Sequence, residues 1–492
     1  MTSEGTKTLR LPVDSDTNAL INHLIAELAA RRRRNYLRSC YYDGKHAVRR
    51  FGSGIIPGSY FTLGLVLGWS AKAVDVLARR CNLDGYIWPD GDLDSLGYTE
   101  VWDDNFFGTE SSSGVISSLI HGPAFLINTT GDDGEPGALI HTKDATNATG
   151  DWNPRTRHLD NLLSVIKRDD ESTPTEFNLY LSGRTLIAKR DRRWEIDWEE
   201  HDWGVPVEAP IYKPRVGRPF GYSRISRTVM SLQDRATRTV LRMEGHADLF
   251  SFPELWMLGA DANEVLVDDQ GNPLPTWKAM MGRIKSIKDD PDADDKELAR
   301  ADVKQFLQSS PTPHIELFKQ CANDFAGETD LPVSALGVQA AVNSTTQDGS
   351  DNAEKQLIAE AEGAIDDWAP AFRRAMMRAL AIKNGEDGIP DAYRSIDTKW
   401  RNPAYVSRAA LADAGMKQLA AVPWLAETEV GLELLGMSDQ QIKRALAEKA
   451  AAQRRQATSS LIDKLAAGAP NEVPTTATST AAASETDGGL AN

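Results

Sequence analysis

The sequence predicts an α+β protein that is mainly α-helical. Long segments with apolar residues at helical spacing fill most of the chain, and a region rich in β-forming residues interrupts them between residues 115 and 215. The chain has 492 residues, of which 41% are hydrophobic and 26% are charged. This composition is typical of a globular protein, and the length exceeds what one ordinary hydrophobic core accommodates.

Two helices are predicted near the N-terminus. The first spans residues 14–43, where Asp14 or Ser15 can cap the start and Gly44 can end the helix. Its apolar face contains Leu20, Ile21, Leu24, Ile25 and Leu28. The second runs from Ser70 to about Leu83. Both therefore pack one face against a core.

The β-rich region predicts an antiparallel sheet beside helices. In FNLYLSGRTLIAKR, two alternating runs joined by Ser182 and Gly183 indicate a hairpin. In WEIDWEEHDWG, alternation places Trp194, Ile196 and Trp198 on one face and the acids on the other. A polar strand face is one interpretation of these acids, and a divalent-metal nuclease site is the alternative. The polar set is Glu195, Asp197, Glu199, Glu200, His201 and Asp202.

The second half of the chain predicts further helices separated by turns. A long helix spans residues 223–250, and Pro253 stops it. The elements predicted after it are a strand in ELWMLG, a helical piece around WKAMMGRIKSI, a helix over 312–326, a flexible loop over 335–350, a helix over 351–383, helices over 407–422 and 438–455, and a disordered tail over 457–492.

Charge and motifs exclude several functional classes. The net charge of −16 disfavours tight, sequence-independent binding of phosphates. The three cysteines, Cys40, Cys81 and Cys321, form no CxxC pair, so neither a zinc site nor a disulfide framework is indicated. No GxSxG, HExxH or GxxxxGK[ST] motif occurs. The start MTSEGTKTLR is polar, and no apolar stretch reaches the ~20 residues that span a bilayer. We expect no catalytic residues, no cofactor, no bound metal and no membrane partner.

Five segments carry a resemblance to a known family. They are YYDGKHAVRR with AVDVLARRCNLDGY, GRPFGYSRISRTVMSLQDRATRTVLRMEGHADLFSFPELWMLG, FAGETDLPVSALG with its polar loop and long helix, and SIDTKWRNPAYVSRAALADAGMKQL. In this order, over about residues 35–450, they resemble the portal proteins of tailed bacteriophages, the subunits of head-to-tail connector rings.

The resemblance implies a portal-type subunit with a wing, a two-helix stem, a clip and a helical crown. The implied divisions are a wing over 1–222 with a return segment over 384–405, stem helices over 223–250 and 312–327, a clip over 251–311, a tunnel loop over 335–350, a long wing helix over 351–383, a crown over 406–456 and the disordered tail over 457–492.

The implied function is a homo-oligomeric ring, commonly of about twelve copies, at one capsid vertex. Double-stranded DNA would transit the ring during packaging and ejection. The implied partners are the terminase motor, the major capsid and scaffolding proteins, and a head–tail adaptor, with the protein in host cytoplasm during assembly and in the virion afterwards. Twelve upright helices spaced by roughly 10 Å would leave a bore of roughly 28 Å, which admits a duplex. Two alternatives to a portal subunit are the divalent-metal nuclease and another virion structural adaptor protein.

Four charged or polar segments are candidate sites. The helix over 223–250 carries a basic stripe that could face neighbouring subunits, solvent or DNA: Arg224, Arg227, Arg235, Arg238 and Arg242. The tunnel loop offers weak, exchangeable hydrogen bonds to DNA from Gln339, Asn343, Ser344, Thr345, Thr346 and Gln347. The clip carries an acidic docking surface that could alternatively bind a metal ion: Asp289, Asp290, Asp292, Asp294, Asp295 and Glu297. Arg31 to Arg34 are interpreted as cations ending the first helix.

Overall fold

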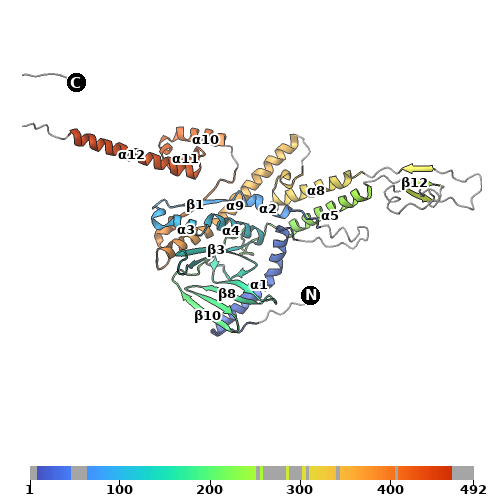
Figure 1. The fold of residues 1–492 in the computed structure, drawn as a ribbon, viewed down its shortest axis with the longest axis horizontal. Coiled ribbons are helices and arrows are strands. Elements are labelled where there is room, and N and C mark those ends of the chain that lie inside the picture. Colours follow the sequence, from blue (N-terminus) through green and yellow to red (C-terminus); the bar gives the residue numbers. More distant parts are fainter. Residues whose placement is uncertain are drawn as a thin grey trace, which may run out of the picture. The chain divides into compact units, whose positions relative to one another are not determined.

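The chain forms two compact units, Met1–Ala404 and Tyr405–Asn492. The structure, a computed structural model, describes residues 8–45, 64–250, 255–258, 284–287, 302–305, 310–338, 344–404 and 408–467. Helices dominate both units, and the strands lie in the first (Figure 1). The predicted α+β class with mainly helical content is therefore confirmed.

Helix α1 (Ser15–Tyr42) packs on the largest sheet of the first unit. Asp14 caps its start, accepting a hydrogen bond from the Thr17 backbone N–H at 2.9 Å, as the sequence predicts. The sheet has the strand order β10-β9-β8-β7-β4. Its strands are β4 (Ala148–Thr149), β7 (Leu162–Arg168), β8 (Pro174–Leu181), β9 (Arg184–Arg190) and β10 (Trp194–Glu200).

The predicted hairpin and the predicted alternation are both present in this sheet. Leu181 pairs with Arg184, so Ser182 and Gly183 form the two-residue turn between β8 and β9. Gly183 has a φ of +80°, a conformation that only glycine adopts easily. On β10, Trp194, Ile196 and Trp198 pack on the core beneath α1 while the acids are exposed.

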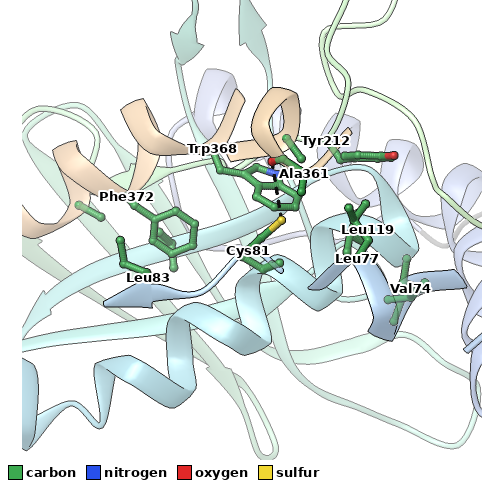
Figure 2. Close-up of a cluster of buried hydrophobic side chains, with 14 of the residues drawn as sticks. Val74, Leu77, Cys81, Leu83, Leu119, Tyr212, Ala361, Trp368 and Phe372 are labelled. Carbon is green, nitrogen blue, oxygen red and sulfur yellow. Dashed lines mark hydrogen bonds between the residues drawn. The ribbon is translucent and has the colours of Figure 1, made fainter. Parts of the chain in front are cut away.

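A second sheet, with the order β11-β2-β3, packs against two helices. The strands are β2 (Ala124–Thr130), β3 (Ala138–Asp144) and β11 (Val207–Glu208), and the helices are α4 (Phe107–His121) and α9 (Ser344–Lys383). Trp368 and Phe372 of α9 are completely buried in the main core (Figure 2). The Trp368 indole N–H donates to Ser118 Oγ of α4 at 3.0 Å, which satisfies its polar edge.

The C-terminal end of the first unit returns to its N-terminal part. Strand β15 (Asp397–Trp400) pairs antiparallel with β1 (Leu83–Ile87), which follows α2 (Trp69–Ala78). Nearby are α3 (Tyr98–Asp104) and the 3₁₀ helices η2 (Asp94–Leu96) and η4 (Asp391–Ser395). A two-stranded piece joins β5 (Trp152–Asn153) to β6 (His158–Leu159).

Two helices that pack against each other and a small three-stranded sheet also belong to the first unit. Helix α5 (Arg227–Phe250) lies beside α8 (Thr312–Thr329), which the 3₁₀ helix η3 (Val333–Leu336) follows (Figure 1). The sheet order is β13-β12-β14, with β12 (Leu255–Leu258) parallel to β13 (Ile284–Ile287) and antiparallel to β14 (Asp302–Gln305).

The second unit is helical where it is described. Its elements are α10 (Arg408–Ala421), the 3₁₀ helix η5 (Pro423–Glu427), α11 (Glu429–Leu434) and α12 (Asp439–Ala467). Ser438 and Gln441 form a reciprocal cap at the start of α12, with hydrogen bonds of 3.0 and 3.4 Å. Ile442 of α12 is completely buried.

Four predictions of local structure were wrong. The β-rich region begins later than residue 115, because α4 extends to His121. Residues 284–287 form a strand instead of a helix, because they pair with β12, a segment distant in sequence. Helix α9 begins at Ser344, so the predicted loop over 335–350 is wrong for residues 344–350. Residues 457–467 belong to α12, because this stretch is rich in the helix formers Ala, Leu and Lys.

The buried cysteines lead to a first prediction. Cys81 is 3% exposed, and its thiol lies 3.8 Å from the Ala361 carbonyl oxygen (Figure 2). Burial raises the pKa of Cys81 to about 12, and Cys321 is also buried. We expect a disulfide reagent at pH 8 to modify at most one thiol of the native protein, Cys40, and all three in denaturant. Rapid modification of a Cys40→Ser variant in its native state would contradict this expectation.

No helix among the described residues is both long enough and apolar enough to cross a membrane.

Candidate functional site

The two helices α5 and α8 form the first part of the candidate site, and they are called the helix pair below. Their contact buries Cys321, Ala322 and Phe325 of α8 and Val229 and Ala236 of α5. At the surface, the Arg235 guanidinium lies 2.9 Å from an Asp324 carboxylate oxygen. The pair is therefore held by an apolar seam, and the exposed ion pair adds little stability.

The first half of α5 is fixed by a local cap and by hydrogen bonds to distant segments. Ser226 caps the helix, with its hydroxyl accepting from the Val229 backbone N–H at 3.1 Å. Gln233 accepts a hydrogen bond from the Ser70 backbone N–H of α2 at 2.8 Å, and Tyr41 of α1 donates to Asp234 at 2.9 Å. Both contacts bind one face of α5 to the first two helices of the chain.

Arg224 does not belong to a basic stripe, which corrects the sequence prediction. It precedes α5 and is only 8% exposed. Its Nε donates to the Ala73 carbonyl at 2.5 Å and its Nη2 to the Thr329 carbonyl at 2.6 Å. A buried guanidinium needs such acceptors, so this side chain is a structural tie between α2, the start of α5 and the end of α8. Arg227, Arg235 and Arg242 are exposed, and Arg238 is half-buried.

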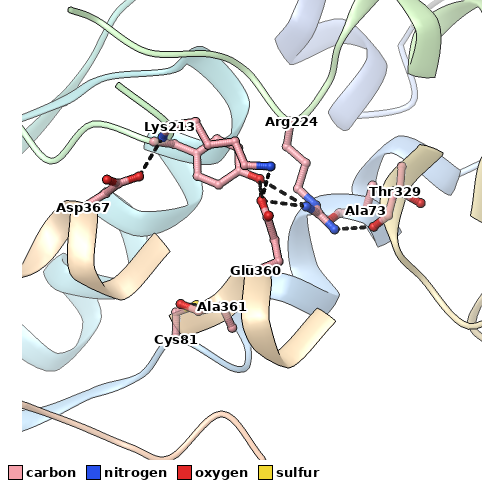
Figure 3. Close-up of polar contacts among 9 residues, drawn as sticks. Ala73, Cys81, Lys213, Arg224, Thr329, Glu360, Ala361 and Asp367 are labelled. Atoms are coloured by element: carbon pink, nitrogen blue, oxygen red, sulfur yellow. Dashed lines mark hydrogen bonds and ion pairs between the residues drawn. The ribbon is translucent and has the colours of Figure 1, made fainter. Parts of the chain in front are cut away.

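Glu360 of α9 completes the polar cluster around Arg224 (Figure 3). Its carboxylate lies 3.6 Å from Arg224 Nη1 and 2.6 Å from Lys213 Nζ, and it accepts a hydrogen bond from the Tyr212 hydroxyl. Burial raises the pKa of Tyr212 and that of Asp367, whose carboxylate accepts from the Lys213 backbone N–H at 3.1 Å. The cluster joins α9 to the base of the helix pair through charge-assisted hydrogen bonds.

A second buried ionic cluster fixes α9 to the second sheet. Glu208 of β11 is 4% exposed and accepts from Arg374 Nε at 2.8 Å and from Arg378 Nη2 at 2.7 Å. Arg378 Nη1 also donates to Asn128 of β2 at 3.3 Å, and Asn128 donates to the Ala375 carbonyl at 3.0 Å. A buried carboxylate with two arginines is costly to disturb, since either partner alone would be a desolvated charge.

A basic cavity of about 370 Å³ lies between α1, the start of β2 and the segment before α5. We call it the arginine cavity. Its lining contains four arginines, Arg31, Arg34, Arg38 and Arg218, together with His121, and no acidic residue. Arg38 donates to the His121 carbonyl at 2.9 Å. The sequence interpretation of Arg31–Arg34 as cations at a helix end was wrong, because α1 continues to Tyr42.

His121 in this cavity leads to a pH prediction. Burial lowers its pKa to about 4, with Asp144 opposing and Arg38 adding to the shift. Between pH 4 and the ordinary value near 6.5, the unfolded chain binds a proton at this position and the folded chain does not, so stability falls as pH falls through this window. From pH 7 to 4.5 we expect wild type to lose about 2–3 kcal/mol more of its free energy of unfolding than a His121→Gln variant. Urea titrations measure this difference, and exposed His23→Gln should behave as wild type.

The other predicted site residues are placed as follows. Gln339 and Asn343 lie outside the described residues, and Ser344, Thr345, Thr346 and Gln347 lie in the first turns of α9 rather than in a loop. The acidic run from Asp289 to Glu297 lies outside the described residues. Within the described ranges, no group of three or more His, Cys, Asp or Glu side chains could hold a metal ion. The acids at 195–202 are the exposed face of β10 and the turn after it.

Comparisons with known proteins assign the chain to a family. Residues 21–455 match the family described as phage portal protein, SPP1 Gp6-like. The chain therefore belongs to this family of phage portal proteins. Its curated relatives include the portal proteins of Mycobacterium phage L5, 25% identical over 390 residues, and of Mycobacterium phage D29, 25% identical over 389 residues. Each match covers 77% of this chain and 77% of the relative.

Matching solved structures include chains from gene transfer agent (GTA) particles. They are the virion of the native particle (TM-score 0.33, 14% identity), the neck of the empty particle computed with C6 symmetry (0.39, 13%) and the neck of the native particle computed with C12 symmetry (0.35, 16%). Each covers 75% of this chain, and the matched chains are covered over 99%, 90% and 90% of their length respectively.

Proposed function

We propose that the chain is a non-enzymatic structural subunit of the virion that assembles with copies of itself into a ring. Double-stranded DNA passes through the opening of this ring during packaging and ejection. Family membership over residues 21–455 is the observation that carries the proposal. The curated relatives of similar length, both named portal protein, support it.

The helix pair is the proposed stem of the ring. Arg224 and Glu360 hold its base, and the apolar seam joins α5 to α8. Arg227 and Arg242 of α5 are exposed in the single chain, so their charges can contact another molecule. Neighbouring copies are the partners that suit them best, because side-by-side packing of identical helices needs charges that set the register.

Other segments of the chain are proposed to contact partner proteins and DNA. The segment 251–311 is the proposed docking site of the packaging motor and later of a head–tail adaptor. Residues 1–222 with 384–405 are the proposed contact with capsid and scaffolding proteins. About twelve copies would form the ring at one capsid vertex after assembly in the host cytoplasm. The polar residues 339–347 are the proposed weak contact with passing DNA.

Native mass spectrometry and negative-stain images of the purified chain test this function. The expected result is a closed ring with a central opening. A monomer at every protein concentration and ionic strength would contradict the proposal. The same preparation incubated with plasmid DNA and Mg²⁺ or Mn²⁺ tests the enzymatic alternative, in which the acids of β10 would support cleavage. We expect intact plasmid.

A further inference from the structure

Three of the four arginines that line the arginine cavity, Arg34, Arg38 and Arg218, form no ion pair with an acid among the described residues. Burial lowers the pKa of Arg38 to about 10, and the charges of Arg34 and Arg218 act in the same direction. Arg38 is half-buried, whereas Arg34 and Arg218 are exposed at the rim. An anion that enters the cavity would therefore mainly offset the cost of burying the charge of Arg38.

Carboxylates near the cavity are already committed elsewhere. Glu27 pairs with Arg31, the fourth arginine of the cavity, one helical turn away on α1. Asp144 accepts hydrogen bonds from the backbone N–H groups of Thr146 and Asn147 at 2.9 and 3.1 Å. In addition, the Nδ1 atom of His121, which lines the cavity, is buried without a hydrogen-bond partner among the described residues. The cavity therefore offers cationic and polar groups to a ligand from outside the chain.

Strand β10 carries exposed carboxylates, whose charge is opposite to that of the arginine cavity. Asp197 and Glu199 are exposed on the outer face of this strand. Burial beside the strand, with the charges of Asp197 and Asp132, raises the pKa of Glu199. A cationic surface from another molecule would pair with these exposed carboxylates.

The two surfaces lie at opposite edges of one sheet. Ala148 and Thr149, which form β4, line the arginine cavity, and the strand order places β4 at one edge and β10 at the other. Four strand spacings separate these edges by roughly 19 Å. A ring of identical subunits joins two different surfaces of each copy, which must lie on different sides of the subunit. This placement meets that requirement.

We propose that the arginine cavity receives the carboxylates of Asp197 and Glu199 from a neighbouring copy of this chain. The inference rests on the proposed ring and names one contact within it. A carboxylate side chain matches the guanidinium donors geometrically. The cavity volume of about 370 Å³ admits side chains of this size. Phosphate groups of DNA are the other anionic source, and the chain's net charge of −16 makes them the weaker candidate.

Charge reversal in the full-length chain tests the contact. Arg34→Glu with Arg218→Glu reverses the cavity, and Asp197→Lys with Glu199→Lys reverses the strand. Each double variant should form roughly tenfold fewer rings than wild type in about 0.1 M salt, because like charges then face each other across the interface. A chain carrying all four changes restores opposite charges across the interface and should recover most of the rings. Native mass spectrometry counts the rings.

Matched controls separate the contact from a general effect of charge. Arg155→Glu with Lys355→Glu and Asp103→Lys with Asp104→Lys make the same changes in net charge at exposed positions outside both surfaces. These controls should assemble as wild type does. Circular dichroism and thermal midpoints establish that every variant is folded before its rings are counted.

The outcomes distinguish the contact from the function. A wild-type chain that forms no rings overturns the proposed function together with this inference. Wild-type rings with both double variants assembling as their controls overturn the inference alone, and so does a four-residue variant that fails to recover. Normal rings from Arg34→Glu with Arg218→Glu, combined with lost binding of duplex DNA, would assign the cavity to phosphate instead.

Discussion

Replacing Arg224 by methionine should lower the free energy of unfolding by about 3–5 kcal/mol. The substitution removes the donors of the Ala73 and Thr329 carbonyls, which lie in two different helical segments. It also removes one of the cations near Glu360. Methionine fills much of the volume, so the loss reports the polar contacts rather than a cavity. Urea unfolding followed by tryptophan fluorescence measures the change.

Arg227→Met is the matched control for this prediction. Arg227 is exposed and lies one turn further along, so its replacement should change stability by less than about 0.5 kcal/mol. Hydrogen exchange adds a local readout, since the start of α5 should lose protection only in Arg224→Met. If the two variants unfold at the same urea concentration, Arg224 is not the tie between the helix pair and the rest of the unit.

Replacing Glu208 by alanine should cost a similar amount, about 3–5 kcal/mol. Arg378, whose side chain is 7% exposed, would then be a buried cation without its carboxylate, and Arg374 would lose the same partner. A Glu208→Leu/Arg378→Met double variant removes both charges and should recover much of the loss. Denaturant unfolding of the single and double variants forms a cycle that measures the coupling.

An exposed ion pair provides the comparison for Glu208. Asp391 and Arg394 are paired at 2.9 Å with side chains 85% and 78% exposed. Asp391→Ala should therefore have little effect on stability, because solvent screens the pair. Equal losses for Asp391→Ala and Glu208→Ala would show that the buried cluster contributes no more than a surface contact.

Local patterns predicted the elements that local chemistry determines. The Asp14 cap, the turn at Ser182 and Gly183 and the alternation on β10 each depend on residues close in sequence, and all three are present. Predictions failed where a local pattern permits two structures. The polar run after Ser344 has no apolar residues at helical spacing and is nevertheless helical. The segment IKSI at 284–287 ends a stretch that the sequence predicts as helix, but it pairs with β12 as a strand.

The buried polar sites could not be predicted from local patterns, because distant segments create them. Arg224 matched the spacing of an exposed stripe, but its acceptors Ala73 and Thr329 lie 151 and 105 residues away in sequence. The arginine cavity likewise combines Arg34 and Arg38 of α1 with Arg218. A run of arginines signals charge, whereas only the tertiary fold determines whether the charge faces solvent, a carbonyl or another cation.

In the proposed ring, α5 stands beside copies of itself around an opening that admits duplex DNA. A cryo-electron microscopy reconstruction of the assembled protein measures this directly. We expect a ring in which α5 and α8 surround an opening wider than a DNA duplex. An assembly with a closed centre, or one with α5 turned away from neighbouring copies, would contradict it.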